Sequence, residues 1–212
     1  MKTCYIFSAG EGLPENFRKS AGDLIIAADA GYNHLKRLGV VPDIILGDFD
    51  SLKYIPDICE IIKHPKRKDD TDTVLAVKTG FERGYSRFII YGGLGGRLDH
   101  TLANIQTLNF IAKNSGTGFI CGGGLCITSI KNRKIKFKAK ESGNISVFSA
   151  GSKAVGVGIK GLLYELEDAE ITSDFPLGVS NEFIGKESVI SVDDGTLNII
   201  FGGTPDDIIN LS

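Results

Sequence analysis

The first part of the chain alternates short apolar runs with stretches whose apolar residues recur at helical spacing. Five runs rich in β-forming residues are each bounded by Gly, Pro, Asp or Lys: 4–8, 24–28, 44–46, 61–62 and 88–91. The clearest helix is predicted over Leu98 to Lys113, whose apolar residues give one continuous stripe. A second is predicted over Thr73 to Arg83, capped by Thr71 or Asp70. Strands that alternate with helices predict an α/β fold with a doubly wound, mostly parallel (Rossmann-like) sheet, which binds ligands beyond the carboxyl ends of its strands.

After about residue 130 the apolar pattern changes to a period of two. Four segments alternate or cluster β-forming residues: 134–139, 144–150, 188–192 and 196–201. Asp193, Asp194 and Gly195 join the last two and predict a tight hairpin. We therefore expect an α/β domain over residues 1–130 and a smaller all-β domain over residues 131–212.

Composition narrows the class of protein. The chain has 212 residues, 42% of them hydrophobic, and a formal net charge of −2. This balance lacks the basic excess of nucleic-acid-binding proteins. No apolar run approaches the roughly 18 residues that cross a bilayer, and no signal peptide is evident. We therefore expect a cytoplasmic protein with no nucleic-acid or membrane partner. The four cysteines are scattered without metal-site spacing and are expected to be core or incidental thiols.

Polar or glycine-rich clusters follow four of the predicted strands. They are AADAGYNHL (27–35), LGDFDSL (46–52), KRKDDTD (66–72) and YGGLGGRLDH (91–100). Parallel strands release the segments that follow them at one edge of the sheet. We therefore expect the four clusters to converge on one site.

The aspartates of these clusters predict a metal site. With 16 aspartates in the chain, about one D-x-D is expected by chance, so Asp48 and Asp50 alone are weak evidence. The signal strengthens because Asp29, Asp72 and Asp99 are expected at the same edge. Two carboxylates about 5 Å apart repel by roughly 3 kcal/mol at an effective dielectric constant of 20, so several together need a cation. Oxygen ligands suit Mg²⁺, which substrate phosphates commonly complete.

The glycine cluster also points to a phosphorylated ligand. Gly93 and Gly95 lie among four glycines between a strand and a helix, where backbone N–H groups can approach an anion. Arg97 can add a charge-assisted contact to phosphate. The cluster is neither a Walker A loop nor G-x-G-x-x-G. In the neighbouring charge run, Lys68 and Asp72 are expected to face the site, whereas His34 is expected on the surface.

Taken together, the motifs resemble those of the thiamine pyrophosphokinase family. GDFDS at 47–51, KDDTD at 68–72, GGLGGRLDH at 92–100 and GVSNEF at 178–183 occur in the family's order, and ADAGYNHL at 28–35 is similar to its nucleotide-side motif. The resemblance implies ATP-dependent transfer of pyrophosphate to the thiamine hydroxyl, giving thiamine diphosphate and AMP, with Mg²⁺. It also implies an α/β domain followed by a β-sandwich, in a homodimer with shared active sites.

Residue roles follow from the resemblance by position. Asp48, Asp50, Asp72 and Asp99 resemble the carboxylates that handle metal and phosphate, with Asp72, Arg97 and Asp99 as the catalytic set. Asp29 and Asn33 lie on the nucleotide side, together with Lys68, Gly93, Gly95 and Arg97. Ser180 and Asn181 resemble a thiamine-contacting pair. The chain has no tryptophan, so any ring that stacks on thiamine must be Phe183 or Tyr164.

Three alternatives remain open from the sequence. A related pyrophosphokinase acting on a hydroxymethylpterin-type heterocycle would share a similar aspartate loop, but the S-N-E element at 180–182 favours thiamine. A thiamine- or nucleotide-binding module without catalysis would have little need of the full set of carboxylates and Arg97. A purely structural β-domain scaffold would need no metal.

Overall fold

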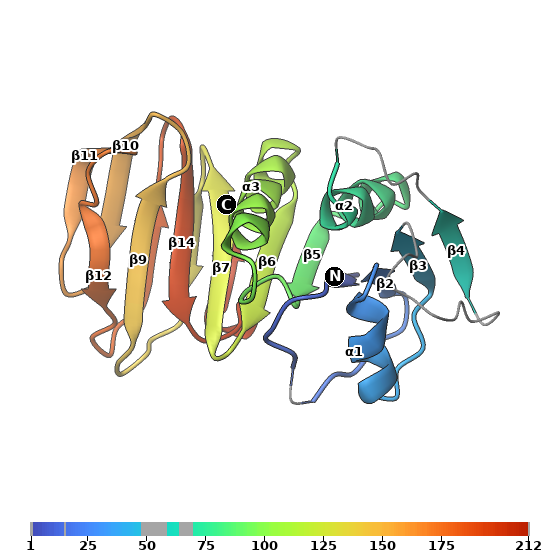
Figure 1. Ribbon diagram of the computed structural model, residues 1–212. Helices are drawn as coiled ribbons and strands as arrows, with labels where there is room; N and C mark the ends of the chain where they lie inside the picture. The colour runs from blue at the N-terminus through green and yellow to red at the C-terminus, as the bar shows by residue number, and fades with distance from the viewer. Residues whose placement is uncertain (1, 15, 48–58, 64–69, 212) are drawn as a thin grey trace. The chain divides into compact units, whose positions relative to one another are not determined.

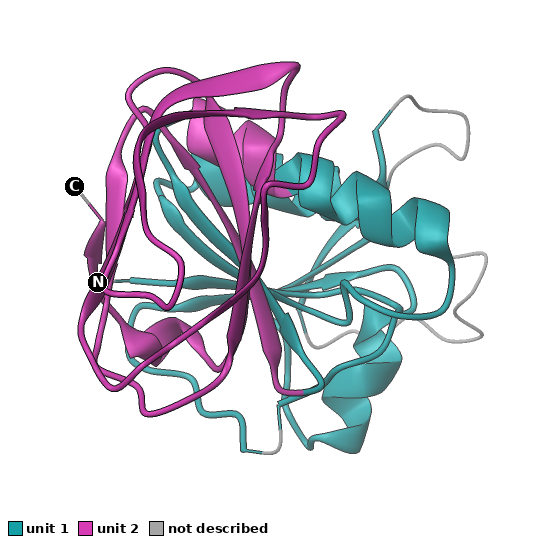
Figure 2. Cartoon of the chain, turned by 90° about the vertical axis from the view of Figure 1, so that its left-hand side faces the viewer, with its two compact units in different colours: residues 1–107, 115–123 teal, residues 108–114, 124–212 magenta. Residues whose placement is uncertain are grey.

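The computed structural model describes residues 2–14, 16–47, 59–63 and 70–211. The chain forms two compact units, residues 1–107 with 115–123 and residues 108–114 with 124–212 (Figure 2). The expected mixed α/β class is confirmed (Figure 1). The elements up to residue 122 are β1 (Cys4–Phe7), β2 (Leu24–Ala28), α1 (Gly31–Arg37), β3 (Ile44–Gly47), β4 (Glu60–Lys63), α2 (Asp72–Glu82), β5 (Arg87–Tyr91), α3 (Leu98–Lys113) and β6 (Thr117–Gly122).

Unit 1 is built on parallel strands in the order β6-β5-β1-β2-β3-β4. Helices cover both faces of these strands, which explains why β2 and β3 are apolar throughout. Leu35 of α1 packs with Phe7 and Ile25 on one face. On the other face Gly80 of α2 lies against Phe88, where an added Cβ would come within 2.5 Å of the ring. From β1 the chain runs outward to β4 and then returns to β5 on the other side of β1. The point where the strand order reverses therefore lies between β1 and β5.

Helix α3 has the predicted bounds but not the predicted buried face. Leu98 and Leu102, at the start of the apolar stripe, are 72% and 55% exposed. Asn104 and Thr107 are buried in their place, whereas Leu108 and Ala112 further along the stripe are buried as predicted. The first half of the apolar stripe is not buried, because the side chain of Asn104 is directed inward to hydrogen-bond the glycine loop (residues 92–96) that precedes the helix.

Unit 2 contains two groups of antiparallel strands. Their orders are β12-β9-β14-β7 and β11-β10-β13-β8-β15. The rings of Phe137 and Phe201, one from each group, lie 5.1 Å apart. The strands are β7 (Leu125–Lys131), β8 (Lys134–Phe137), β9 (Asn144–Ser149), β10 (Lys153–Lys160), β11 (Leu166–Thr172), β12 (Gly178–Glu182), β13 (Ser188–Ser191), β14 (Thr196–Gly202) and β15 (Ile208–Leu211), and a short 3₁₀ helix covers Pro205–Asp207.

The hairpin predicted at 193–195 is wrong. The strands on either side, β13 and β14, do not pair: β13 pairs with β10 and β8, whereas β14 pairs with β7 and β9. The backbone N–H groups of Asp193 and Asp194 both bond the carbonyl oxygen of Val155 in β10, at 3.2 and 3.1 Å. These bonds anchor the turn to β10, at the point where the chain passes from one group of strands to the other.

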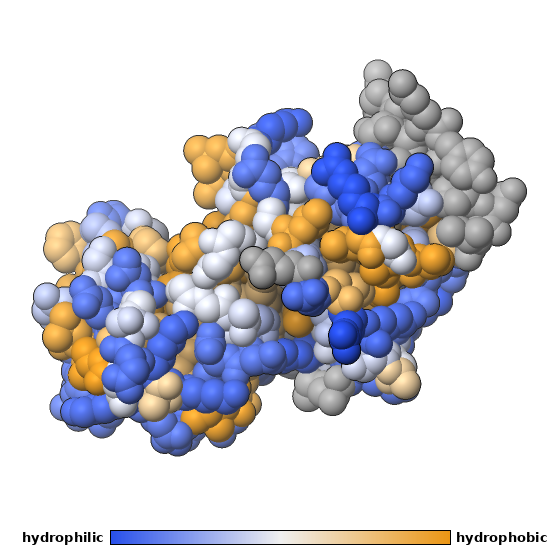
Figure 3. All heavy atoms as spheres, turned by 90° about the horizontal axis from the view of Figure 1, so that it is seen from below, coloured by the Kyte–Doolittle hydropathy of each residue, from blue (hydrophilic) through white to orange (hydrophobic). Residues whose placement is uncertain are grey.

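The cysteines agree with the expectation of core or incidental thiols. All four cysteines are free thiols, three of them buried. In the described part of the chain, no helix combines the length and the apolar character needed to span a membrane. On the face drawn in Figure 3, hydrophobic side chains lie among hydrophilic ones.

Candidate functional site

A cavity of about 480 Å³ opens in unit 1 at the carboxyl ends of its strands. Its walls come from Ser8 to Gly10 after β1, Ala28 and Asp29 at the end of β2, Asp70 to Thr73 at the start of α2, Gly92 to Arg97 after β5, and His100, Ala103 and Asn104 of α3. The loops after β1 and β5 flank the reversal of strand order, where ligands bind in open α/β sheets. Parts of three of the four predicted clusters thus meet at one cavity. The fourth, 46–52, lies almost entirely outside the described residues, including Asp48 and Asp50, as does Lys68.

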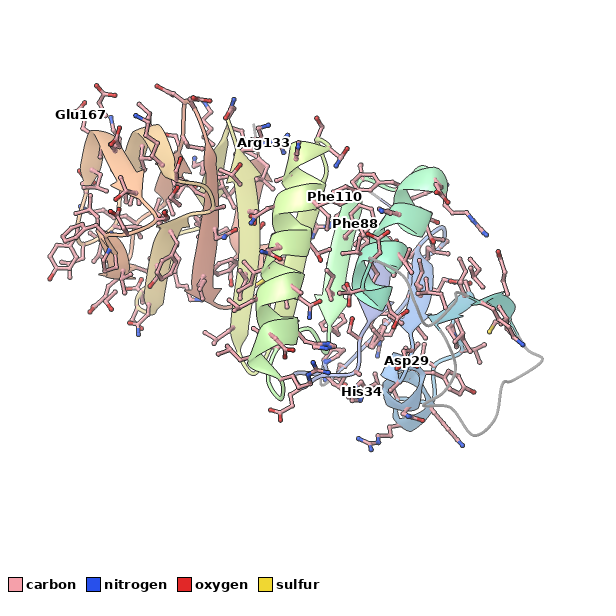
Figure 4. The ribbon with its side chains drawn as sticks, turned by 45° about the horizontal axis from the view of Figure 1, so that its top comes forward. Asp29, His34, Phe88, Phe110, Arg133 and Glu167 are labelled. Carbon is pink, nitrogen blue, oxygen red and sulfur yellow. The ribbon has the colours of Figure 1, made fainter. Side chains whose placement is uncertain are left out.

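Asp29 stands at the end of β2 in a left-handed backbone conformation, with φ of 47° (Figure 4). Its N–H donates to the Leu46 carbonyl at 2.8 Å, and its Oδ1 atom is buried. Gly31, two residues on, begins α1 so close to β1 that an added Cβ would lie 1.8 Å from the Phe7 carbonyl oxygen. This close contact fixes the chain that carries Asp29 against the cavity.

The first turn of α2 carries Asp72 into the cavity wall. Thr71 caps the helix as predicted, because its side-chain oxygen accepts from the Val74 N–H at 3.3 Å. The buried hydroxyls of Ser8 and Thr73 lie 2.9 Å apart and join the end of β1 to this turn. The position of Asp72 is therefore fixed both within its helix and against the sheet.

The glycine loop is held from two sides. The loop after β1 lies along it, with the Gly10 N–H donating to the Gly92 carbonyl at 2.8 Å and the Glu11 N–H donating to the Leu94 carbonyl at 2.7 Å. An added Cβ at Gly92 (φ 67°) would come within 2.2 Å of the Ser8 carbonyl oxygen, so only glycine fits there. Asn104 of α3 donates from Nδ2 to the Gly93 carbonyl at 2.8 Å. Gly93 and Gly95 both line the cavity.

Arg97 and Asp99 form an ion pair at the start of α3. The guanidinium Nη2 and Nε atoms lie 2.6 and 3.2 Å from the two carboxylate oxygens. The hydrogen bond from Arg97 lowers the pKa of Asp99, and the same bond raises the pKa of Arg97. Both side chains are largely exposed, at 72% and 64%, so the pair itself adds little stability. Arg97 lines the cavity.

The described residues hold no group of three or more His, Cys, Asp or Glu side chains arranged to bind a metal. Asp29, Asp70 and Asp72 line the same cavity, but Asp70 is paired with Lys78 at 2.5 Å. Their carboxylate oxygens, with His100 as the one nitrogen ligand on the described wall, suit a hard cation such as Mg²⁺. Asp48 and Asp50, two other carboxylates predicted to bind a metal, lie outside the described residues.

Other predicted residues lie away from this cavity. Asn33 is exposed on α1 and does not line it. Ser180 and Asn181 belong to β12 of unit 2. Ser180 is exposed with a left-handed φ of 60°, whereas Asn181 is 3% exposed and hydrogen-bonds the backbone of Tyr164.

The expectation that His34 is a surface residue is wrong. Its ring is partly buried, and Nε2 lies 2.9 Å from the Gly10 carbonyl oxygen. A carbonyl only accepts, so Nε2 carries the proton, and the buried Nδ1 has no hydrogen-bond partner among the described residues. His34 thus links α1 to the loop after β1 (Figure 4).

Sequence reasoning missed the residues that hold the cavity wall. These are Ser8, His34, Thr73 and Asn104. Their partners lie 65 positions away for Ser8 and Thr73, 24 for His34 and 11 for Asn104, beyond the three- or four-residue spacing that a local pattern shows. The sequence held one weak signal of these contacts: Asn104 is a polar residue within a helix predicted to be well packed.

Two models of one family match most of the chain. The model described as the thiamin pyrophosphokinase catalytic domain matches residues 18–118, and that described as its vitamin B1 binding domain matches residues 132–197. Among curated relatives, thiamine pyrophosphokinase of Bacillus subtilis is 28% identical over 193 residues, which cover 84% of this chain and 86% of the relative. Thiamin pyrophosphokinase 1 of Caenorhabditis elegans is 27% identical over 173 residues, covering 74% and 70%.

Solved structures agree with these matches. The crystal structure of thiamine pyrophosphokinase from Bacillus subtilis superposes with a TM-score of 0.84 at 25% identity, covering 96% of this chain and 100% of the other. Thiamin pyrophosphokinase from Candida albicans, at 15% identity, shares the fold with a TM-score of 0.77 and covers 96% and 89%. The chain therefore belongs to the thiamine pyrophosphokinase family.

Proposed function

We propose that the protein transfers the pyrophosphoryl group of ATP to the hydroxyl of thiamine, giving thiamine diphosphate and AMP. In this reaction the hydroxyl oxygen bonds to the β-phosphorus, and the bond from that phosphorus to the oxygen bridging the α-phosphate breaks. AMP leaves and the hydroxyl proton is lost. The observation that carries the proposal is the cavity where the glycine loop, Arg97 and Asp72 meet at the reversal of strand order.

The nucleotide is proposed to bind with its phosphates on the glycine loop. Backbone N–H groups around Gly93 and Gly95, next to the start of a 16-residue helix, favour an anion there. The Arg97 guanidinium can stabilise the negative charge that develops on the transferred pyrophosphoryl group. Asp29, Asn33 and Lys68 are proposed to serve the nucleotide side, Asp29 from the cavity wall itself.

A divalent metal, proposed to be Mg²⁺, would be held by Asp48, Asp50, Asp72 and Asp99. When bound it would neutralise phosphate charge and align the triphosphate. Asp72 is also proposed to orient the thiamine hydroxyl, whose high pKa lets a carboxylate take its proton only late in the transfer. Asp99 is paired with Arg97 in the structure and does not line the cavity, so it would hold a metal only if this pair opened, and the guanidinium would then be available to phosphate.

The second unit is proposed to supply the thiamine side through Ser180 and Tyr164. Phe183 is 3% exposed and packs against the ring of Phe137, so it is not free to stack on a ligand. Tyr164 is 63% exposed, and its ring can stack on a cationic heterocycle such as the thiazolium of thiamine. Residues 1–130 are proposed as the ATP- and metal-binding domain, and residues 131–212 as a β-sandwich for thiamine binding and dimerisation. A homodimer with shared sites and a cytoplasmic location remain part of the proposal.

One assay tests the reaction. The purified protein is incubated with ATP, Mg²⁺ and thiamine, and the adenine nucleotide product is identified. AMP formation that depends on thiamine is expected. ADP as product would indicate simple kinase chemistry, absence of turnover would indicate a binding module, and AMP formation only with a hydroxymethylpterin would indicate the related pyrophosphokinase.

Asp72→Asn tests the role of the carboxylate. The variant keeps the size of the side chain, so the protein should stay folded while turnover falls by orders of magnitude. Near-normal AMP formation in a folded Asp72→Asn protein would remove Asp72 from the mechanism.

A further inference from the structure

The amide of Asn181 is fully used inside the protein. Its Oδ1 accepts from the backbone N–H groups of Tyr164 and Glu182, each at 2.9 Å, and its Nδ2 donates to the Tyr164 carbonyl at 2.6 Å. Only this orientation of the amide is consistent with all three bonds, because the opposite one would point NH₂ at two N–H donors. With the side chain 3% exposed, little of Asn181 remains to touch a ligand.

A β-bulge places Asn181 in this position. The pairing of β12 with β9 shifts register between Gly178 and Asn181, and Ser180 within the shift has a left-handed φ of 60°. Val179 and Ser180 are consecutively exposed, which a regular strand would not give. The extra residue turns Asn181 inward, toward the connection between β10 and β11.

Tyr164 lies in that connection. In the described part of the chain, hydrogen bonds hold its backbone and not its side chain. Both its N–H and its C=O bond the Asn181 amide, and the neighbouring Leu163 N–H donates to the Glu182 carbonyl at 3.0 Å. Its side chain is 63% exposed. The backbone of Tyr164 is therefore fixed while its ring faces outward.

We propose that Asn181 is a positioning residue that presents the ring of Tyr164 to thiamine, and that it does not contact thiamine itself. The inference rests on the proposed function, because the ligand of Tyr164 is taken to be thiamine. It changes the role that the resemblance implied for Asn181, while leaving Ser180 as the exposed member of the pair. It also gives a chain without tryptophan an exposed aromatic ring on a fixed segment of backbone.

A double-mutant cycle tests whether Asn181 acts through Tyr164. Tyr164→Ala removes the ring and is expected to raise the KM for thiamine about tenfold. Asn181→Ala is expected to raise it by about five- to tenfold, with the KM for ATP unchanged. The double variant should match Tyr164→Ala alone, because Asn181 has nothing left to position. Asn181→Asp should resemble Asn181→Ala, because its carboxylate would face the Tyr164 carbonyl without a proton to donate.

Asn132→Ala is the matched control. Asn132 is another asparagine of unit 2 whose Oδ1 accepts a backbone N–H, from Gly195 at 2.9 Å. Its loss should leave the KM for thiamine within about twofold, since it holds a turn remote in sequence from Tyr164. Equilibrium dialysis gives thiamine affinity without turnover, and hydrogen exchange at the Tyr164 N–H should accelerate in Asn181→Ala but not in Asn132→Ala.

The outcomes separate this inference from the function on which it rests. Wild-type protein that forms no thiamine-dependent AMP overturns both. In an active wild type, multiplication of the two single effects in the double variant would show that Asn181 contacts thiamine independently. An unchanged exchange rate at Tyr164 in Asn181→Ala would equally overturn the positioning role.

Discussion

At the residue scale, Asp29 carries a backbone cost that can be measured apart from its chemistry. Its φ of 47° is left-handed, and a β-carbon in that region costs roughly 1–2 kcal/mol. Both Asp29→Ala and Asp29→Gly remove the carboxylate, but only glycine escapes this cost. After allowing for the greater freedom of glycine in the unfolded chain, we expect Asp29→Gly to be more stable than Asp29→Ala by about 1 kcal/mol in urea unfolding.

The same pair of substitutions at Lys36 provides the control. Lys36 is exposed within α1, where glycine should be less stable than alanine by about 1 kcal/mol. The two sites should thus differ in sign. Equal stability of Asp29→Ala and Asp29→Gly would show that the left-handed conformation carries no cost. Nucleotide affinity is a separate readout: both variants lack the carboxylate and should lose affinity to the same extent.

Arg97 and Asp99 allow a prediction about pH. Because the Arg97 hydrogen bond lowers the pKa of Asp99 in the folded protein, the stability from this pair is present above the unfolded pKa and is lost as pH falls through the folded pKa. Arg97→Gln should raise the Asp99 pKa toward its ordinary value. The measurement is an NMR titration of the Asp99 carboxyl group.

Lys78→Gln serves as the comparison in that titration. It breaks the ion pair with Asp70 in the same unit and should leave the Asp99 midpoint where it is. If Arg97→Gln also left the midpoint unchanged, the ion pair would not be the cause of the low pKa.

Residue types and spacing predicted part of this site. Asp29, Asp72 and Arg97 were found because chemically distinctive residues follow predicted strands, and Thr71 because capping is a local interaction. The Ser8 to Thr73 contact joins residues 65 positions apart, so no local pattern could show it.

At the scale of elements, α3 shows where periodicity stops being sufficient. Its 16 residues were predicted correctly because length and bounds depend on local sequence. Its buried face in the first half depends instead on a loop that needs a hydrogen-bond donor, and Asn104 supplies it. The β13 and β14 connection failed for a related reason, since the turn signal at Gly195 is real but its partner strand is β10.

Asn104→Leu should therefore be costly despite making the helix more apolar. It leaves the Gly93 carbonyl without its donor, which we expect to cost about 1–3 kcal/mol of unfolding free energy. Because Gly93 lines the cavity, the KM for ATP should also rise. Chemical denaturation and steady-state kinetics measure the two effects.

The comparison variant lies just past the end of the same helix. The Asn114 Nδ2 donates to the Phe110 carbonyl at 2.8 Å in an exposed position, where water can replace it. Asn114→Leu should change stability by less than about 0.5 kcal/mol. Similar costs for the two asparagines would mean that burial of the Gly93 carbonyl is not what matters.

At the scale of the whole molecule, the two units are not consecutive stretches of chain. Helix α3 gives residues 98–107 to unit 1 and residues 108–113 to unit 2, and the chain then returns to unit 1 for β6. A hydrophobic pattern read along the chain finds changes of period, and so placed one boundary near residue 130. It cannot find a helix whose two halves belong to different units. The functional division at residues 130 and 131 stays a prediction.

This shared helix predicts that the units unfold together. Neither unit can unfold without disrupting α3, so calorimetry should show one transition in place of two.

Mg·ATP at 100 times its dissociation constant should stabilise the folded state by about 2.7 kcal/mol, which for a chain of this size raises Tm by roughly 5–10 °C. Thiamine, although proposed to bind the second unit, should move the same transition. EDTA should remove most of the shift due to ATP. Two separate transitions, of which Mg·ATP moved only one, would show that the units are energetically independent despite their common helix.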